Sequence, residues 1–425
     1  MKVAVLGGTG LIGSAVAAHL CSKGHSVVLM SRGAAKQSAS GISVDISKAT
    51  SPSYWLPYLE GVSAVVNCAG VLQDGPNEST SAVHYLGIAH LFSACEILGI
   101  RRVIHFSAVG VDRQRPTPFS QTKLAGDNVL MERDLDWVVL RPSVVIGRPA
   151  YGASALMRGL AALPLVPVMP DTGLIQIVLL DDVVRTVEHF LTEGTPSREI
   201  VELVGPCRYS LAEVIALFRR WYRWRPARQI HLPRLITGLL YRSGDTISLL
   251  GWRPPVRSTA RREIARGAVG DASHLKRYTL HPKSLAEFFS AEPASVQERW
   301  FARMYFLKPA VYVVLSVFWI STAFVSLGPG WNYGIDLMRE GGTKETVAAL
   351  TVIAGAVADF AIGVAIAYRP LSRLGLYAAI GISLTYAVVG TFLVPRLWAD
   401  PLGPMLKIWP IIMVHFVALA ILDDR

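Results

Sequence analysis

The chain has 425 residues, of which 52% are apolar and 17% are charged, and its formal net charge is +11. This length predicts about two to four domains, and soluble domains usually carry about 25% charged residues. The apolar excess excludes an intrinsically disordered protein and disfavours a purely soluble globule. The positive charge suits a partner that carries phosphates, such as nucleic acid, an anionic membrane face or a nucleotide.

The four cysteines are widely separated along the chain, and no two of them form a CxxC pair. This spacing favours neither a structural zinc site nor a disulfide framework, so no metal site is predicted and a reducing compartment is expected. Glycines interrupt the apolar start of the chain, which is therefore not predicted to be a cleaved signal peptide. The cysteines are Cys21, Cys68, Cys95 and Cys207.

The first residues have the pattern of a nucleotide-binding fold. Residues 2–6 (KVAVL) are typical of a buried strand and run into the glycine-rich sequence 7–13 (GGTGLIG), after which a helical pattern and a second strand at 26–30 follow. This order predicts an α/β Rossmann domain with a doubly wound parallel sheet, in which the glycine turn lets a pyrophosphate approach a helix N-terminus. The predicted cofactor contacts in this turn are Gly7, Thr9, Gly10, Leu11, Ile12 and Gly13.

The end of the second strand indicates which dinucleotide is preferred. An acidic residue there usually holds the free 2′-hydroxyl of NAD(H), whereas this chain has Arg32. A cation suits a 2′-phosphate, so NADP(H) is predicted in preference to NAD(H); the alternative is that Arg32 is a solvated loop charge. Asp45 follows a strand-like segment at 41–44 and is predicted to lie near the adenine.

Three further strand patterns end at residues that are expected to face a ligand, because parallel sheets bind ligands at the carboxyl ends of their strands. Strand 62–66 leads to Ala69 and Gly70, strand 102–106 leads to Ser107, and strand 137–140 leads to Pro142.

The ordered motifs GGTGLIG, NCAG, FSAVG, LRPSVVIG and LDDV resemble the extended or atypical short-chain dehydrogenase/reductases over roughly residues 1–290. Within that family they are most similar to the branch that contains the NAD(P)H-binding accessory subunit of respiratory complex I. The resemblance implies a Tyr that donates a proton to the substrate carbonyl, a Lys four residues later that holds the ribose, and a Ser that orients the carbonyl. By spacing, these positions are occupied by Phe119, Lys123 and Ser107.

Phe119 has no transferable proton, so the usual acid–base step cannot run through this residue. Chemistry at the site would require a substitute donor such as Thr117, Ser120, Tyr151 or a water, or a reaction that needs no acid.

Other candidate residues have simpler alternatives. Lys123 could be a plain helix-surface lysine, and Ser107 an ordinary strand-end cap. Asp181 and Asp182 are predicted to cap a helix at 183–192 rather than to take part in catalysis.

The C-terminal part of the chain contains four apolar stretches of about the 20 residues that a helix needs to cross a bilayer. It resembles the DoxX-like membrane domain that is fused behind such reductase domains in some bacterial proteins. The alternative is a buried four-helix bundle of a soluble protein, whose helices would normally show a polar stripe. The stretches lie at 309–327, 346–368, 374–394 and 405–422.

Charges near these stretches predict a multi-pass protein of an inner or cytoplasmic membrane. Arg369 and Arg373 fill a tight turn that the positive-inside rule assigns, with the nucleotide domain, to the cytoplasm. Asp359 and His415 lie inside apolar stretches, where they serve either as a proton relay or quinone-headgroup contact, or as structural hydrogen-bonding groups. Expected structural partners are Asn332, Thr385 and Tyr386.

The middle of the chain is strongly basic. Residues 219–277 contain 14 Lys and Arg against three acidic residues, interleaved with Trp and Tyr. Such a mixture could stack on nucleic-acid bases, but directly before a membrane domain it is predicted to bind anionic lipid headgroups and no nucleic acid. The predicted domains are a nucleotide domain at 1–205, a basic lid and membrane-proximal region at 206–305, and a membrane domain at 306–425.

These features favour a membrane-anchored NADP(H)-binding protein, acting as an oxidoreductase on a lipid or quinone-like substrate with an atypical active site. The alternative is a non-catalytic assembly or regulatory subunit of a respiratory or quinone-linked membrane complex, which would have a membrane-protein partner. A third possibility is an epimerase or dehydratase for a nucleotide sugar or isoprenoid-linked substrate, although such enzymes also usually need the missing Tyr.

Overall fold

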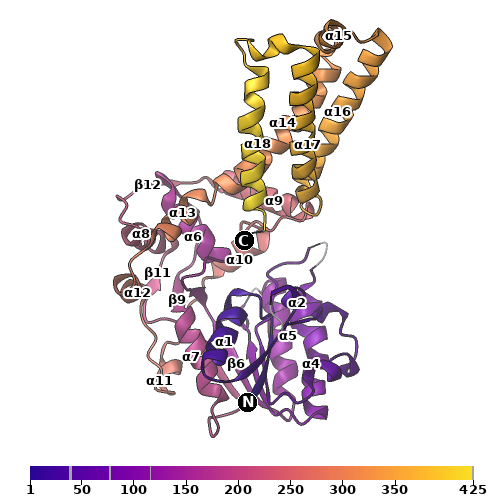
Figure 1. Ribbon diagram of the computed structural model, residues 1–425. Helices are drawn as coiled ribbons and strands as arrows, with labels where there is room; N and C mark the ends of the chain where they lie inside the picture. The colour runs from indigo at the N-terminus through magenta and orange to yellow at the C-terminus, as the bar shows by residue number, and fades with distance from the viewer. Residues whose placement is uncertain (38–40, 76–77, 115, 424–425) are drawn as a thin grey trace. The chain divides into compact units, whose positions relative to one another are not determined.

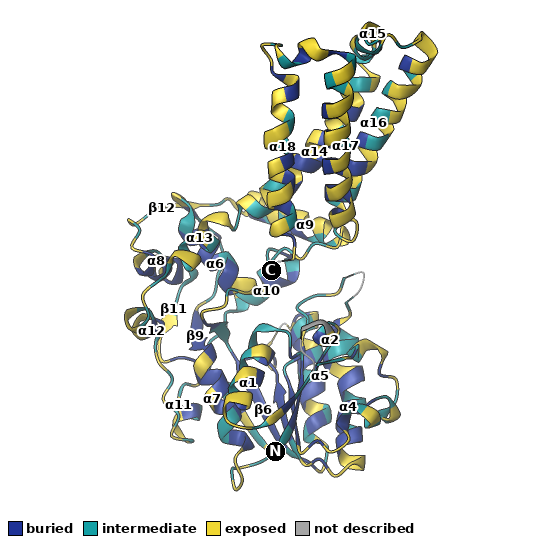
Figure 2. Ribbon diagram, viewed as in Figure 1, coloured by how far each residue is buried: buried dark blue, intermediate teal, exposed yellow. Residues whose placement is uncertain are grey.

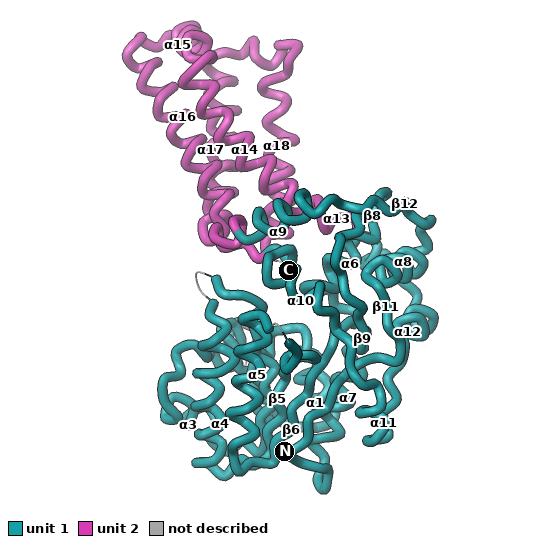
Figure 3. Tube along the Cα trace, turned by 180° about the vertical axis from the view of Figure 1, so that it is seen from behind, with its two compact units in different colours: residues 1–245, 254–302 teal, residues 246–253, 303–425 magenta. Residues whose placement is uncertain are grey.

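The chain forms two compact units (Figure 3). The computed structural model describes residues 1–37, 41–75, 78–114 and 116–423. Unit 1 comprises residues 1–245 and 254–302, and unit 2 comprises residues 246–253 and 303–425.

Unit 1 is built around a sheet that is flanked by helices (Figure 1). The sheet has seven strands in the order β10-β6-β5-β4-β1-β2-β3, and all of its strand pairs are parallel. The strand order reverses between β1 and β4, which is the point at which sheets of this kind bind ligands. This confirms the predicted doubly wound α/β fold. The strands are β1 (Lys2–Leu6), β2 (Ser26–Ser31), β3 (Gly41–Ser43), β4 (Ala64–Asn67), β5 (Arg102–Phe106), β6 (Asp136–Pro142) and β10 (Glu199–Leu203).

Helices cover both faces of this sheet, and the strands between them are buried, as the dark blue segments in Figure 2 show. Helices α1 and α7 pack on one face, and α3, α4 and α5 pack on the other. Burial of apolar side chains on both faces explains the continuous apolar runs of the strands. The helices are α1 (Leu11–Ser22), α2 (Ala34–Gln37), α3 (Leu56–Leu59), α4 (Gly87–Ile97), α5 (Pro118–Met131) and α7 (Leu180–Leu191), with short helical turns η1 (Ile46–Lys48), η2 (Pro52–Tyr54) and η3 (Ala82–Leu86).

The rest of unit 1 consists of two small sheets, β11-β9-β7 and β12-β8, and a set of helices. The helix α8 begins at a capping box, in which the Ser210 and Glu213 side chains each accept a hydrogen bond from the other's backbone N–H. The elements are β7 (Val144–Ile146), β8 (Leu165–Val168), β9 (Ile175–Leu179), β11 (Arg208–Tyr209), β12 (Arg228–His231), α6 (Gly152–Ala162), α8 (Leu211–Trp221), α9 (Arg234–Leu249), α10 (Ser258–Arg266), α11 (Ser273–Lys276), α12 (Leu285–Ala291) and α13 (Val296–Met304).

One predicted helix start is wrong. Helix α7 begins at Leu180, so Asp181 and Asp182 lie in its first turn, and the N-cap position is held by Leu179 without a side-chain cap. The Asp182 carboxylate instead pairs with Arg185 and accepts a hydrogen bond of 3.1 Å from the backbone N–H of Lys283. Acidic residues remain favourable there because of the helix dipole.

Unit 2 is all helical, and three of its helices are long and apolar enough to cross a membrane within the described residues. The fourth predicted span is shorter than expected, since α18 has 17 residues, about 26 Å at 1.5 Å per residue, and contains Pro410. The segment between the first two long helices contains the helix α15. The elements are α14 (Leu307–Leu327), α15 (Trp331–Glu340), α16 (Glu345–Ala367), α17 (Ser372–Leu393), η4 (Pro395–Trp398) and α18 (Pro404–Ala420).

The outward faces of the long helices are apolar and exposed, as the yellow segments of unit 2 in Figure 2 illustrate. Val314, Leu350 and Phe392 are 63%, 63% and 81% exposed, respectively. A soluble bundle would present polar residues at such positions. The exposed apolar surface therefore favours a membrane domain over a buried soluble bundle.

Asp359 and His415, which lie inside the apolar stretches, have hydrogen-bonding partners. The Tyr386 hydroxyl donates to the Asp359 carboxylate at 3.1 Å, which confirms one of the three expected partners. The indole N–H of Trp319 donates to Nε2 of His415 at 2.9 Å. Such bonds satisfy polar groups that would be costly in hydrocarbon.

Replacing Gly363 by Ala should loosen the contact between α14 and α16. A Cβ at this position would lie 2.9 Å from the backbone oxygen of Ser316 and 2.6 Å from a side-chain carbon of Ile320. We expect Gly363→Ala to destabilise unit 2 by about 1–3 kcal/mol, the usual cost of overpacking, measured as a lower Tm of the full chain in detergent. Gly381→Ala is the control, because its Cβ would meet nothing within 4 Å, and an equal loss in both variants would contradict the argument.

Candidate functional site

The turn between β1 and α1 leaves a helix N-terminus available for an anion. Gly7 has φ of +68°, and its N–H donates to the backbone oxygen of Met30 at 2.8 Å, while the N–H of Gly10 donates to the oxygen of Gly7 at 2.9 Å. Helix α1 begins at Leu11 without a side-chain cap. The first-turn N–H groups of an uncapped helix carry partial positive charge and bind phosphates.

The close approach of α1 to this turn requires glycine at position 13. A Cβ on Gly13 would lie 2.3 Å from the oxygen of Gly7 and 2.9 Å from the Cα of Gly8. At the outer side of the turn, the Thr9 hydroxyl donates to the Ser31 hydroxyl at 3.0 Å. The residues predicted to surround a pyrophosphate, including Leu11 and Ile12 in the first turn of α1, are therefore together and fit such a group.

An open pocket of about 350 Å³ lies at the carboxyl ends of β2 and β3. Arg32 lies on its wall and forms an ion pair of 3.2 Å with Glu78. Asp45 accepts hydrogen bonds from the N–H and hydroxyl of Ser47, at 3.1 and 2.7 Å, and so begins η1. The pocket is lined by Arg32, Ser43, Val44, Asp45, Lys48 and Tyr54.

Lys123 is buried and points into the sheet edge, which excludes a plain helix-surface lysine. Its Nζ donates to the backbone oxygens of Phe106 and Ala69, at 2.7 and 3.2 Å. Burial lowers the pKa of Lys123 to about 8, against the opposing attraction of the Asp127 carboxylate. Gly70 passes close by, since a Cβ there would lie 3.4 Å from Nζ.

Ser107 belongs to a buried network rather than to an open surface. Its hydroxyl donates to Oδ2 of Asp127 at 2.8 Å, and the same oxygen accepts bonds from Arg141 at 3.0 and 3.2 Å. Nε2 of His105 lies 3.5 Å from the other oxygen, Oδ1. Burial raises the pKa of Asp127, although Arg141 opposes this shift. The Ser107 hydroxyl is thus engaged by Asp127, and the oxygen of Pro142, at the end of β6, accepts the N–H of Val109 at 3.0 Å.

The Phe119 ring packs edge-on against the imidazole of His84, with ring centroids 5.5 Å apart. Nε2 of His84 accepts the backbone N–H of Val71 at 2.9 Å, and Nδ1 lies 2.9 Å from the Thr122 hydroxyl. Burial lowers the pKa of His84 to about 2, so this imidazole is neutral at physiological pH. The position at which the Tyr was expected therefore holds the apolar ring of Phe119, which packs against the neutral imidazole of His84.

Two of the hydroxyls that could replace the Tyr are bound by helix α10. Thr117 and Ser120 both donate to Oε1 of Glu263, the latter at 2.9 Å. Arg266 donates to the Ser120 hydroxyl at 2.5 Å and to Glu263 at 3.1 Å. The third candidate, Tyr151, is 40% exposed and lies at the start of α6. Helix α10 therefore covers the segment that carries the substitutes.

Several site residues were not anticipated from the sequence. Asp127 follows Lys123 by four positions in α5, so the helical spacing could have drawn attention to it. Arg141 belongs to the LRPS motif that was noted without a role. Glu263 and His84 gave no local signal, because their partners lie far away in the sequence.

The burial of Lys123 predicts a pH dependence of stability. Because the folded-state pKa is lowered to about 8, the unfolded chain binds more protons than the folded one above that pH. Between pH 8 and about 10.5, the usual Lys pKa, the wild-type chain should gain stability relative to Lys123→Met. Tm values of the ligand-free protein in detergent would measure this, with Lys276→Met, which removes an exposed lysine, as the control. A constant difference across that range would refute it.

Comparison with known proteins agrees with this geometry. Residues 7–161 match the sequence profile of a family described as NAD(P)H-binding, and residues 316–416 match that of the DoxX-like family. The 40 kDa subunit of mitochondrial NADH-ubiquinone oxidoreductase from Neurospora crassa is 24% identical over 67% of this chain and 76% of its own length. The photosystem II assembly factor Ycf39 from Synechocystis is 22% identical over 52% of this chain and 67% of its own.

An uncharacterised protein of Mycobacterium tuberculosis is 26% identical over 52% of this chain, but the match spans only 23% of that relative's length. Among solved structures, UDP-glucuronic acid 4-epimerase from Bacillus cereus, bound to UDP-glucuronic acid and NAD, aligns with TM-score 0.52 and 18% identity. It covers 69% of this chain and 98% of its own. UDP-glucose 4-epimerase from Thermotoga maritima aligns with TM-score 0.51 and 15% identity, covering 73% of this chain and 100% of its own.

These structural likenesses concern the fold alone. Together with the family matches and the three long apolar helices, they identify the chain as an NAD(P)H-binding domain of the Rossmann type joined to a DoxX-like membrane domain.

Proposed function

We propose that this chain is a membrane-anchored NADP(H)-binding protein that holds the dinucleotide as a ligand, without Tyr-dependent carbonyl reduction. The proposal depends mainly on one observation: Phe119 occupies the position of the Tyr, and the nearby hydroxyls are hydrogen-bonded to carboxylates. Ser107 donates to Asp127, and Thr117 and Ser120 donate to Glu263. A hydroxyl held by a carboxylate in the protein interior is poorly placed to protonate a substrate carbonyl.

The preference for NADP(H) over NAD(H) rests on the pocket after β2 and β3. Arg32 and Lys48 line it together with Ser43, which supplies two cations and a hydroxyl for a 2′-phosphate. Arg32 is exposed and paired with Glu78, so phosphate would replace that carboxylate as its partner. Arginine binds phosphate through two parallel hydrogen bonds, which makes this exchange favourable.

The relatives support a role in assembly or regulation. Two of them are named as a photosystem II assembly factor and as a subunit of NADH-ubiquinone oxidoreductase. By analogy, the partner that we propose is another membrane protein of a respiratory or quinone-linked complex. Orientation with the nucleotide unit in the cytoplasm is supported by Arg369, in the turn between α16 and α17, and by Arg373, in the first turn of α17.

A second candidate function is an oxidoreductase for a lipid or quinone-like substrate. The observation that favours it is the attached DoxX-like domain with its exposed apolar helices. Bound NADPH would supply the hydride in such a reaction. Lys123, whose pKa is lowered to about 8 by burial, is the group of this chain that could then hold a proton near the nucleotide.

Arg32→Ala should selectively weaken NADPH binding. Loss of a charge-assisted hydrogen bond to phosphate costs about 1.5–3 kcal/mol, or about tenfold or more in Kd, whereas the Kd for NADH should change little. Ligand-induced shifts of Tm and fluorescence titration of the full chain in detergent would measure both. Arg133→Ala is the matched control, since Arg133 also pairs with a glutamate, Glu96, at 3.1 Å. Protection of the wild-type chain by NADH but not by NADPH would refute the preference.

Turnover assays distinguish the two candidate functions. We expect the wild-type chain in lipid nanodiscs to oxidise no NADPH with a panel of quinones and lipid carbonyls. Activity that disappears in Lys123→Ala but persists in Lys276→Ala would instead establish the oxidoreductase. Activity that survives Lys123→Ala would argue against reductase chemistry at this site. Phe119→Tyr adds the missing phenol and tests whether that group alone limits the reaction.

A further inference from the structure

Helix α9 (Arg234–Leu249) has two different faces. Thr237, Tyr241 and Gly244 are buried and follow one another at spacings of four and three residues, so they share one side of the helix. The Tyr241 hydroxyl lies 3.0 Å from the sulfur of Met169, and Arg261 stacks over the Tyr241 ring. This side of α9 is therefore bound within unit 1.

The packing of this inner side is close. A Cβ on Gly244 would lie 1.7 Å from the backbone oxygen of Val256, so only glycine permits the contact. Asp245 accepts hydrogen bonds from Gln73 at 3.0 Å and from the N–H of Ser258 at 3.1 Å. These bonds fix the rotation of α9 about its own axis.

The opposite side of α9 is apolar and exposed to solvent. Leu235, Ile236, Leu239 and Leu240 are 76%, 50%, 59% and 41% exposed, respectively. Their spacing places them together on the side away from Thr237 and Tyr241. A row of four large aliphatic side chains on one helix face is unfavourable in water and marks a binding surface.

The segment after α9 is hydrogen-bonded to the turn that joins the long apolar helices α16 and α17. Residues 246–253 belong to unit 2. Within that unit, the N–H of Arg369 donates to the oxygen of Leu250 at 2.9 Å, and the Trp252 indole donates to the oxygen of Ala367 at 2.7 Å. Ala367 is the last residue of α16, and Arg369 begins the turn to α17. The C-terminal end of α9 thus continues into the rim of the membrane domain.

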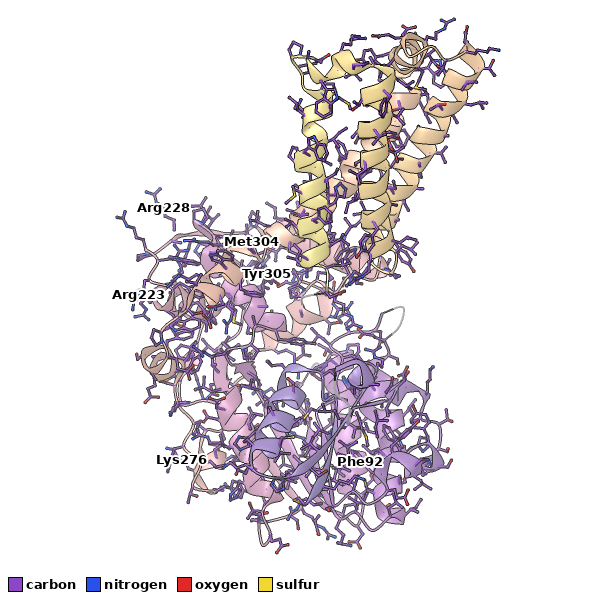
Figure 4. All side chains as sticks on the ribbon, viewed as in Figure 1. Phe92, Arg223, Arg228, Lys276, Met304 and Tyr305 are labelled. Atoms are coloured by element: carbon purple, nitrogen blue, oxygen red, sulfur yellow. The ribbon has the colours of Figure 1, made fainter. Side chains whose placement is uncertain are left out.

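Positive charge accompanies the apolar face. Arg234 and Arg242 are exposed on α9 itself, and Arg223 and Arg228 are exposed on the segment before it. Figure 4 shows the side chains of Arg223 and Arg228 extending outward from the end of the unit near β12. A helix with one aliphatic face and arginines beside it is typical of helices that lie in the headgroup region of anionic bilayers.

Helix α13 repeats the pattern at the other entry to the membrane domain. Val296, Trp300 and Met304 follow one another at four-residue spacing and are 53%, 67% and 38% exposed. Only two residues separate Met304 from the first residue of α14, Leu307. Tryptophan is favoured at membrane–water interfaces. The helices at both places where the chain enters unit 2 therefore carry an exposed apolar stripe.

We propose that α9 is an interfacial helix, whose face formed by Leu235, Ile236, Leu239 and Leu240 inserts into the headgroup region of an anionic lipid bilayer. The proposal rests on the membrane anchoring of the proposed function and assigns its lipid contact to a specific surface. It commits to lipid rather than protein, because the chain at the end of α9 is bonded to the turn between two helices of membrane-spanning length.

The test measures the depth of a nitroxide label on the full chain in nanodiscs of phosphatidylcholine and phosphatidylglycerol. The exposed cysteines Cys21 and Cys207 are replaced by serine, and the label is attached after Leu239→Cys. Ile97→Cys is the matched control, because Ile97 is an aliphatic residue of similar exposure, 63%, on helix α4. Collision rates with oxygen and with a water-soluble nickel complex report lipid and water, respectively.

We expect oxygen collisions to exceed nickel collisions at position 239 and the reverse at position 97. Nickel collisions that dominate at both positions would overturn the proposal. Low rates of both at position 239 would also overturn it, since they would indicate cover by protein. Discs of phosphatidylcholine alone should make position 239 shallower, and equal depth in both compositions would refute the anionic preference.

Parallel measurements separate this proposal from the proposed function. Thermal protection by NADPH is measured on the same labelled protein. Lipid depth without NADPH protection would refute the nucleotide assignment alone, whereas NADPH protection with a water-exposed label would refute the interfacial helix alone. A chain that stays soluble without detergent and does not enter nanodiscs would refute the membrane anchoring and the interfacial helix together.

Discussion

The contact between Gly13 and the carbonyl of Gly7 is the constraint on which the nucleotide unit depends. With only 2.3 Å available to a Cβ at residue 13, α1 can begin against the turn only if that residue is glycine. The approach directs the uncapped N-terminus of α1 to the sheet edge between β1 and β4, where the strand order reverses. The anion site therefore follows from backbone geometry, and it is independent of whether the site next to it is catalytic.

Around that backbone site, three hydroxyls and the Lys123 ammonium are hydrogen-bonded to neighbouring groups. Asp127 is bonded by Ser107 and Arg141, Glu263 is bonded by Thr117, Ser120 and Arg266, and Lys123 is held by two backbone oxygens. Two buried atoms of the network, Oδ1 of Asp127 and Nε2 of His105, lie 3.5 Å apart and have no hydrogen-bond partner among the described residues. The engagement of the Ser107, Thr117 and Ser120 hydroxyls by carboxylates is the physical reason for preferring a ligand role over carbonyl reduction.

Patterns of local origin predicted much of this structure. The strands at 2–6 and 102–106, the glycine turn and the apolar helices depend on residues close in sequence, whose periodicity reports burial directly. The partner of Ser120 could not be predicted in this way, because Glu263 is 143 residues from Ser120 and its pairing depends on where α10 packs. The predicted start of α7 was wrong because Asp residues are favoured both at the N-cap position and in the first turn of a helix. Tyr386 was named as a partner for Asp359 because few polar groups lie in the apolar stretches.

The exposed face of α9 shows the limit of such patterns most clearly. Its sequence places Leu235, Ile236, Leu239 and Leu240 at helical spacing, and periodicity alone would be expected to turn these residues toward a protein core. The structure instead buries Thr237, Tyr241 and Gly244. Gly244 packs so closely that an added Cβ would lie 1.7 Å from the oxygen of Val256, and Asp245 is hydrogen-bonded to neighbouring segments, so this face of the helix points inward. Because Gly244 and Asp245 set the orientation of α9, its leucines stay outside the protein core, and such residues are stable there only in contact with another apolar medium. In a chain whose next residues bond to the end of a membrane helix, that medium is lipid.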